Sequence, residues 1–543
     1  MPDDSFHVFD TTLRDGAQRE GVNLTIADKL AIARLLDEFG VGFIEGGWPG
    51  SNPKDTEFFQ RATHELPLEH AQLTAFGATR RAGVRAADDP QVAALRDSGA
   101  PVVTLVAKSD VRHVEHALRT TPEENLAMIA DTVAHLRDSG QRVFLDCEHF
   151  FDGYRYDPEY AVSVVRTAAD AGADVVVLCD TNGGMLPADV TEIVTTVGER
   201  TGVRLGMHAQ DDSGCAVANT LAAVDAGATH VQCTANGYGE RVGNANLFTV
   251  VGDLALKYGR PVLPDGCLSE MTRVSLAVAE IVNIAPATHQ PYVGVSAFAH
   301  KAGLHASAIK VDPDLYQHTE PTLVGNDMRM LVSDMAGRAS IELKAKELGL
   351  DLGEDREVLG RVVDRVKTLE QSGYSFEAAD ASLELLLREE LGRQVRYFET
   401  ESWRVIAERG GAADAWPAAP GATPGQEGGE AVSEATVKLY VKGERVIATA
   451  EGNGPVNALD RALRSAVEGV YTALASLSLT DYKVRILEDG AGTGAITRIL
   501  VTFSDGRSEW TTVGVGENVI DASWIALEQA VSYGLLAQGY PAP

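Results

Sequence analysis

The 543-residue chain lacks any apolar run approaching the ~20 residues that a membrane-spanning helix requires. It also lacks an excess of basic side chains: 47 Lys and Arg face 78 Asp and Glu, which gives a formal net charge of -31 at pH 7. This balance argues against nucleic acids and anionic membranes as partners. A basic and apolar leader is also missing before the first strand-like residues, so we expect a cytoplasmic protein.

Cysteine is scarce, and no two cysteines have the CxxC spacing that is typical of zinc and redox motifs. The first four fall in expected strands or at the beginnings of expected helices. That placement favours buried free thiols over disulfides or zinc clusters. The five residues are Cys147, Cys179, Cys215, Cys233 and Cys267.

Eight strand-like runs occupy the first half of the chain, and most are separated by about 25 to 35 residues with a helical pattern. They span residues 7–10, 42–46, 73–77, 102–107, 142–147, 174–179, 204–207 and 230–233. The first helix is marked by Thr25 as its cap, by Asp28 in its first turn and by Gly40 at its end. Eight such units close as an α/β TIM (β/α)8 barrel, whose active site lies at the carboxyl ends of the strands. Two doubly wound domains are the competing fold, but no GxGxxG sequence follows an early strand.

The chain divides into four parts by composition and pattern. Residues 1–270 would form the barrel, 271–409 are mostly helical, 410–433 resemble a flexible linker, and 434–543 read as a smaller α/β domain. Two related segments of the last part, 452–458 and 514–518, each precede an expected helix and suggest a pseudo-symmetric pair of halves. Their glycines are either tight turns or part of a site where helix N-termini hold a small carboxylate.

Polar residues at the ends of strands are the main indication of function. Asp15 follows the first strand, Asn244 follows the eighth, and His208 and Gln210 share one side of the seventh. One imidazole, one carboxylate and one or two amide oxygens favour Mg²⁺ or Mn²⁺ over a structural zinc ion. For Asp15 or His208 alone, a loop cap or a core hydrogen bond is the alternative explanation.

The fifth and sixth strands also end in polar sequence. Residues 146–152 hold four ionisable side chains, among them Glu148, which are costly to bury without a purpose. The sixth strand runs into Thr181. Arg14, beside Asp15, would place a guanidinium next to the metal, where it can grip a 2-oxo acid carboxylate or stabilise an enolate. Each of these could be a structural ion pair, but their recurrence at one end of successive strands indicates a catalytic site.

Together these motifs resemble those of the DRE-TIM metallolyases. The resemblance rests on residues 11–16, His208, residues 236–244 and residues 300–305. Within that family the chain is similar to the acetyl-CoA-dependent 2-isopropylmalate, homocitrate and citramalate synthases. Residues 46–55 and 148–154 look most like the longer bacterial citramalate synthases. The likeness covers nearly the whole chain, including helical subdomains after the barrel and a C-terminal LeuA-type regulatory and dimerisation domain.

The resemblance implies a Claisen-type condensation of acetyl-CoA with a 2-oxo acid, in which pyruvate would give (R)-citramalate for isoleucine biosynthesis. It also implies a divalent metal, a homodimer and an amino-acid effector, isoleucine, at the C-terminal domain. The metal ligands it implies are Asp15, His208, Gln210 and Asn244; the catalytic residues are Arg14, Glu148, His305 and Tyr316; and the substrate-binding residues are Arg14 and Thr181.

Two departures from the family pattern bear on these expectations. The family usually has His-x-His-Asn-Asp on the seventh strand, and here Gln210 replaces the second histidine. An amide in place of an imidazole should weaken binding of soft metals and favour Mg²⁺ or Mn²⁺. The fourth strand ends in residues 106–110, Val-Ala-Lys-Ser-Asp, where citramalate synthases commonly have Gly-Lys-Ser-Trp. That segment lies near the oxo-acid pocket, so a larger 2-oxo acid remains an alternative substrate.

Two further classes of protein are alternatives. A lyase or a biotin-dependent carboxyltransferase would share the barrel, but residues 237–241 lack the cysteine of the lyase loop and the chain has no Met-Lys-Met biotin sequence. The protein could also be a non-enzymatic amino-acid sensor, in which Gln210 has abolished catalysis by the barrel and residues 436–540 bind the amino acid. The presence of the full set of expected catalytic residues favours an enzyme.

Overall fold

The computed structural model describes residues 4–351, 356–409, 431–487 and 494–541. They form two compact units: Met1–Phe298 with His318–Met328, and Ala299–Gln317 with Arg329–Pro543. Of the expected linker, residues 410–430 lie outside the described residues, and residues 431–433 begin a strand. The four-part division made from the sequence stays a prediction.

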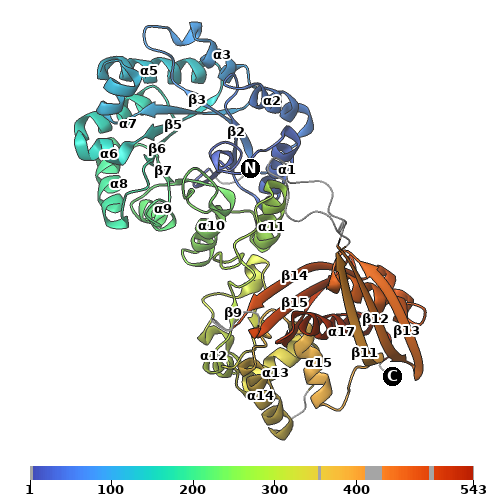
Figure 1. Cartoon of the computed structure of the whole chain (residues 1–543). Helices are drawn as coiled ribbons and strands as arrows, with labels where there is room; N and C mark the ends of the chain where they lie inside the picture. The colour runs from blue at the N-terminus through green and yellow to red at the C-terminus, as the bar shows by residue number, and fades with distance from the viewer. Residues whose placement is uncertain (1–3, 352–355, 410–430, 488–493, 542–543) are drawn as a thin grey trace. The chain divides into compact units, whose positions relative to one another are not determined.

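The first unit contains a closed barrel of eight parallel strands in sequential order, with helices around it (Figure 1). The strands are β1 (His7–Asp10), β2 (Phe43–Gly47), β3 (Gln72–Ala78), β4 (Val102–Lys108), β5 (Arg142–Glu148), β6 (Val175–Asp180), β7 (Leu205–Ala209) and β8 (His230–Cys233). Pairing of β1 with β8 closes the barrel. The predicted TIM barrel is confirmed, and no strand boundary differs from its prediction by more than two residues.

The helices of this unit alternate with the strands. They are α1 (Ile26–Phe39), α2 (Pro53–Glu65), α3 (Pro90–Arg96), α4 (Val111–His113), α5 (Pro122–Asp138), α6 (Phe150–Tyr156), α7 (Pro158–Asp170), α8 (Pro187–Thr201), α9 (Ala216–Asp225), α10 (Leu247–Leu256) and α11 (Met271–Val282). The caps of α1 are as expected: Thr25 and Asp28 exchange side-chain and backbone hydrogen bonds, and Gly40 ends the helix at a φ of 89°.

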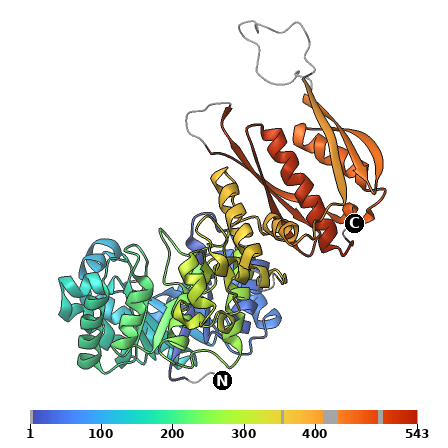
Figure 2. The same cartoon turned by 90° about the horizontal axis from the view of Figure 1, so that it is seen from below.

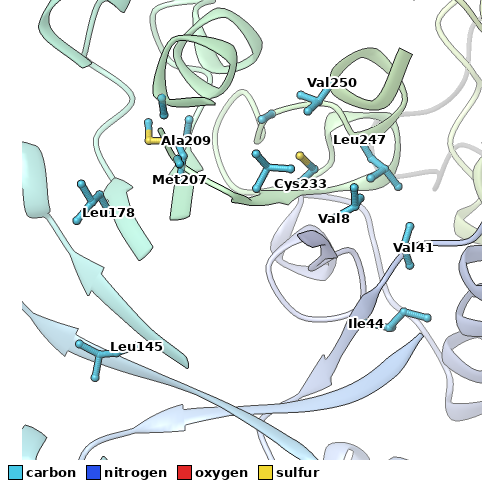
Figure 3. Close-up of a cluster of buried hydrophobic side chains, with 14 of the residues drawn as sticks. Val8, Val41, Ile44, Leu145, Leu178, Met207, Ala209, Cys233, Leu247 and Val250 are labelled. Carbon is cyan, nitrogen blue, oxygen red and sulfur yellow. The ribbon is translucent and has the colours of Figure 1, made fainter. Parts of the chain in front are cut away.

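Side chains alternate between the helices and the barrel interior along each strand. Those that point outward, such as Val8, Ile44 and Leu178, join a large apolar core against the helices (Figure 3). Those that point inward form a second cluster that includes Phe9 and Phe43. Inward positions nearer the carboxyl ends of the strands become polar. These are Glu45, Asp146, His208 and Gln232, and all are buried.

Two buried histidines lie at the opposite end of the barrel. Their burial predicts that the folded protein loses stability as the pH falls. His7 Nδ1 is 3.2 Å from His230 Nδ1, and burial together with the charge of Arg204 lowers the pKa of His7 to about 4. Between pH 6.5 and 4 the unfolded chain therefore binds more protons at His7 than the folded one, so stability falls as the pH falls. We expect His7→Asn to remove about 1 kcal/mol of the stability lost between pH 7.5 and 5.5.

Calorimetric unfolding at the two pH values measures this effect. His64→Asn, at an exposed histidine of α2, is the control and should keep the acid sensitivity of the unsubstituted protein. Equal acid sensitivity in His7→Asn and the control would contradict the assignment.

The second unit has a helical part and a part with two sheets. The helices are α12 (Gly303–Ile309), α13 (Arg338–Glu347), α14 (Arg356–Gln371) and α15 (Asp380–Glu390), and the short strands β9 (Ala299–His300) and β10 (Arg329–Met330) pair beside them. One antiparallel sheet contains β11 (Phe398–Arg409), β12 (Ala431–Val441) and β13 (Glu444–Gly452), and α16 (Pro455–Val467) follows it. The other contains β14 (Ser478–Ile486), β15 (Thr497–Ser504) and β16 (Glu509–Gly516), and α17 (Val519–Ala537) follows it (Figures 1 and 2).

The near-repeat seen in the sequence therefore corresponds to two halves, each with three strands and a helix. One glycine in the last strand of each half, Gly452 in β13 and Gly514 in β16, permits close packing against the helix that follows. A Cβ atom on Gly452 would lie 2.5 Å from the backbone nitrogen of Ala458, and one on Gly514 would lie 1.9 Å from the carbonyl oxygen of Ala522. Packing thus requires glycine at both positions, whether or not a ligand binds nearby.

Two further expectations concern the whole chain. The five cysteines are free, with Cys147, Cys179 and Cys233 buried and Cys215 and Cys267 only partly so. Within the described ranges, no helix combines the length and the apolar character needed to cross a membrane.

Candidate metal centre and active site

Four of the predicted site residues meet at the carboxyl end of the barrel. His208 Nε2 lies 3.2 Å from Asp15 Oδ2, and Asn244 Nδ2 donates to the same carboxylate oxygen at 2.8 Å. Gln210 Nε2 lies 3.4 Å from Asp15 Oδ2 and 3.5 Å from His208 Nε2. A backbone bridge between Gln210 and Asn244 holds the strand-seven and strand-eight segments together. The structure thus gathers the carboxylate, the imidazole and both amides around one point.

The donor set of this cluster fits a hard divalent cation. Gln210 Oε1 and Asn244 Oδ1 are buried and have no hydrogen-bond partner among the described residues. A half-turn of either amide would direct its oxygen to the point that its nitrogen now faces. Asp15 and His208 would complete a set of three oxygens and one nitrogen, which suits Mg²⁺ or Mn²⁺. Within the described residues, no group of three or more His, Cys, Asp and Glu side chains could hold a metal.

The charges around Asp15 keep it ionised. Burial alone would raise its pKa, but the Arg14 guanidinium 3.6 Å away and the hydrogen bonds from His208 and Asn244 hold the pKa well below its usual range. Burial would likewise lower the pKa of His208, and its contact with Asp15 outweighs this and raises it. A carboxylate that stays charged in a buried site is what a cation requires.

Arg14 is held by a residue that the sequence did not single out. Its Nε donates to Glu45 Oε2 at 2.6 Å, and its guanidinium lies 3.8 Å from the ring centre of Phe76. Thr11 Oγ1 donates to the same Glu45 oxygen at 2.6 Å. Glu45 is fully buried, and the signal that could have found it is a single charge at an inward position of an apolar strand. The Arg14 side chain is therefore fixed beside Asp15 before any ligand binds.

Glu148 lies at the end of β5 and forms an ion pair with Lys108 at the end of β4. The two residues are register partners in the barrel, so the pair follows from strand alignment. Thr181, after β6, accepts a hydrogen bond of 2.8 Å from the backbone N–H of His149. Lys108 was noted in the sequence only as part of a departure from the family pattern, and its pairing with Glu148 was missed.

A cavity of about 470 Å³ opens beside this ion pair. It draws its lining from the ends of β2 to β5 and the segments that follow them, which is where substrates bind in barrels of this kind. It combines apolar and cationic side chains with one carboxylate. Its lining includes Trp48, Arg80, Val106, Lys108, Met128 and Glu148.

The other two predicted catalytic residues belong to the second compact unit. The rings of His305 and Tyr316 stack there, with their centres 4.0 Å apart. His305 lies on α12, and Tyr316 follows a short helical turn at Pro313–Leu315. The structure brings these two together, and their roles stay predictions.

Three family models match the chain. The HMGL-like family matches residues 5–278, the homocitrate synthase post-HMGL domain-like family matches residues 292–373, and the LeuA allosteric (dimerisation) domain matches residues 377–535. The matches together cover the barrel and most of the second unit.

Curated relatives match almost end to end. An (R)-citramalate synthase of Streptomyces coelicolor is 72% identical over 538 residues, covering 99% of this chain and 98% of that protein. An (R)-citramalate synthase of Synechocystis is 47% identical over 539 residues, covering 98% and 96%. A 2-isopropylmalate synthase of Methanocaldococcus jannaschii is 30% identical over 525 residues, covering 96% and 93%.

Proposed function

The chain belongs to the (R)-citramalate synthase family within the HMGL-like barrel enzymes, and from that membership we propose how its residues carry out the reaction. The reaction joins the methyl carbon of acetyl-CoA to the keto carbon of pyruvate, and hydrolysis of the thioester then releases CoA and (R)-citramalate. The protein is thus an acyltransferase in which the acyl group becomes an alkyl group on transfer. Its product enters the synthesis of isoleucine.

The metal would be held by Asp15 and His208, with the amide oxygens of Gln210 and Asn244 turned toward it. A bound divalent ion supplies Lewis acidity to the keto group of the 2-oxo acid. The observation that supports this site most strongly is the pair of orphaned amide oxygens around a charged carboxylate and an imidazole. Mg²⁺ and Mn²⁺ are the ions that this donor set favours.

Arg14 and Thr181 would bind and orient the 2-oxo acid. Arg14 is fixed by Glu45 and Phe76 with further N–H groups left to donate, so it can hold negative charge that develops on the keto oxygen. Thr181 has a hydroxyl hydrogen to donate, because its oxygen accepts from the backbone of His149. We assign that donor to the substrate carboxylate.

Glu148 would act as the base that enolises acetyl-CoA. Its carboxylate takes a proton from the methyl group, and the carbon forms the new bond to the keto carbon. Lys108 forms an ion pair with Glu148, and both line the same cavity. His305 and Tyr316 would assist the enolisation and the later attack of water on the thioester, as the family resemblance implies.

A substrate panel tests the reaction directly. We expect acetyl-CoA-dependent release of CoA with pyruvate at a kcat/KM at least ~10-fold above that for 2-oxoisovalerate or 2-oxoglutarate, since extra carbons must find room in a pocket shaped for a methyl group. The assay contains Mg²⁺ or Mn²⁺ and follows free thiol. A higher kcat/KM with one of the larger acids would instead support a 2-isopropylmalate or homocitrate synthase-like enzyme.

The regulatory part of the proposal concerns the second unit. We propose a cytoplasmic homodimer that is inhibited by isoleucine, with the effector's carboxylate held near the N-termini of α16 and α17. A LeuA allosteric domain match and the two similar halves support this placement. Backbone N–H groups at a helix N-terminus favour a carboxylate.

A substitution in the first of the two loops tests the effector site. Asn453→Asp places a negative charge just before α16, where the side chain is exposed, and should raise the isoleucine concentration for half-inhibition about 10-fold through charge repulsion. The basal rate should not change. Asn283→Asp, at the end of α11 in the barrel unit, is the matched control. Unchanged inhibition in Asn453→Asp would place the effector elsewhere.

A further inference from the structure

His208 has a second set of contacts, on the side of its ring away from Asp15. Its Nδ1 lies 2.8 Å from Gln232 Oε1, and Gln232 Nε2 donates to Asp146 Oδ1 at 2.8 Å. The three side chains come from β7, β8 and β5, and each is at most 6% exposed. A buried hydrogen-bond chain therefore runs across the barrel from Asp146 to the imidazole.

Asp146 decides which groups donate and which accept along this series of hydrogen bonds. A carboxyl group offers an acceptor oxygen at Asp146 Oδ1, so the Gln232 amide turns its N–H₂ toward Asp146 and its oxygen toward His208. An oxygen beside Nδ1 requires a hydrogen on that nitrogen. While the ring is charged, its Nε2–H can donate to Asp15; when a cation replaces that proton, the Nε2 lone pair faces the point shared by Asp15, Gln210 and Asn244.

The opposite orientation has a different outcome. If the Gln232 amide turned by 180°, its oxygen would face the Asp146 carboxylate and its N–H₂ would face Nδ1. The hydrogen of His208 would then have to sit on Nε2, where it would block a cation. This alternative is costly when Asp146 is ionised, because the amide oxygen and the carboxylate would repel each other without water between them. Burial raises the pKa of Asp146 to about 7, so the preferred orientation is enforced above that pH.

We propose that Gln232 and Asp146 are positioning residues that fix the tautomer of His208, so that its Nε2 lone pair is presented to the metal. The inference rests on the proposed metal site and adds two residues to it. Partners of this kind behind a ligating histidine typically change metal affinity by 10- to 100-fold when they are replaced. Neither residue would touch the substrate.

Three substitutions separate positioning from packing. Gln232→Met keeps the size of the side chain but removes the acceptor, and should weaken Mn²⁺ binding by about 10- to 100-fold. Gln232→Glu keeps an oxygen beside Nδ1 but replaces the donor to Asp146 with a second oxygen, so the affinity should recover in part, with one proton shared by the two carboxyl groups. Asp146→Asn has the same shape but can accept or donate, so Gln232 can adopt both orientations and the affinity should fall by a smaller factor. Thr104→Val, at a buried position of β4, is the control.

The experiment has two readouts on the full-length protein. Calorimetric titration with Mn²⁺ gives the affinity. Imidazole ¹⁵N chemical shifts of the metal-free protein, followed to a pH at which the His208 ring is neutral and assigned by loss of the His208 signals in His208→Asn, give the tautomer. We expect an Nδ1–H imidazole in the unsubstituted protein and a mixture in Gln232→Met.

The outcomes distinguish this inference from the metal site itself. If the unsubstituted protein binds no Mn²⁺ at the site, the metal proposal fails, while the ¹⁵N shifts still report whether Gln232 sets the tautomer. If Gln232→Met is folded and keeps both the Mn²⁺ affinity and the Nδ1–H imidazole, the positioning role is overturned. If Gln232→Met does not fold, Asp146→Asn gives the same decision, since an unchanged tautomer and affinity there would contradict the role.

Discussion

Replacing Asp15 with Asn should lower kcat/KM for citramalate formation by at least ~10³-fold, because loss of Lewis-acid activation costs several kcal/mol and each 1.36 kcal/mol is tenfold in rate. Asp15 is the only carboxylate in the cluster of Asp15, His208, Gln210 and Asn244, and nearby Arg14 already keeps it ionised. A neutral amide removes the charge that attracts the cation while changing the shape of the side chain little.

Steady-state kinetics over a range of Mn²⁺ concentrations, with Mn²⁺ affinity measured in parallel, check this result. Asp37→Asn is a matched control, since Asp37 is also buried and accepts hydrogen bonds from the backbone N–H groups of residues 69–71. The control should lose stability and keep its metal affinity. Activity of Asp15→Asn that is near that of the unsubstituted enzyme, at any Mn²⁺ concentration, would exclude Asp15 as a ligand.

Replacing Glu148 with Gln should lower kcat by 10²- to 10⁴-fold, the usual contribution of a general base, with little change in Mn²⁺ affinity. The amide is similar in shape but cannot take the methyl proton of acetyl-CoA. Exchange of that proton with deuterium from D₂O, measured by mass spectrometry in the presence of a non-reacting 2-oxo acid analogue, isolates the enolisation step.

A substitution of Lys108 is the control for Glu148→Gln. Lys108→Met removes the partner of Glu148 but leaves the carboxylate, so deuterium exchange should continue at a reduced rate. Glu148→Gln should show none above the uncatalysed background. Exchange at the normal rate in Glu148→Gln would assign the base to another residue.

The barrel was predictable because its signals are local. Strands of four to seven residues separated by capped helices give a repeating pattern, and helix ends such as Thr25 and Gly40 follow from their own chemistry. The sequence positions of Asp15 and His208 at strand ends indicated one shared edge. The 3.2 Å between His208 Nε2 and Asp15 Oδ2 follows from closure of the barrel, because β8 pairs with β1 on one side and with β7, which carries His208, on the other.

The contacts that support the site were not predictable in the same way. Glu45, Lys108 and Gln232 act through neighbours on other strands, and a one-residue shift in register would turn each of them to the opposite face. The pair formed by Lys108 and Glu148 exists because β4 and β5 align these residues. The sequence shows which residues of a strand alternate toward the interior. Which residue of the neighbouring strand lies beside each of them depends on the register of the closed barrel.

The central claim is that one divalent cation is shared by Asp15 and His208. Anomalous diffraction from crystals grown with Mn²⁺, from enzyme whose activity in the same buffer has been measured, tests it most directly. We predict a single strong peak within the barrel, about 2.1 Å from Asp15 Oδ2 and from His208 Nε2, with the amide oxygens of Gln210 and Asn244 turned toward it. Active enzyme whose Mn²⁺ lies away from these two side chains, or that holds none there at saturating Mn²⁺, would contradict the account.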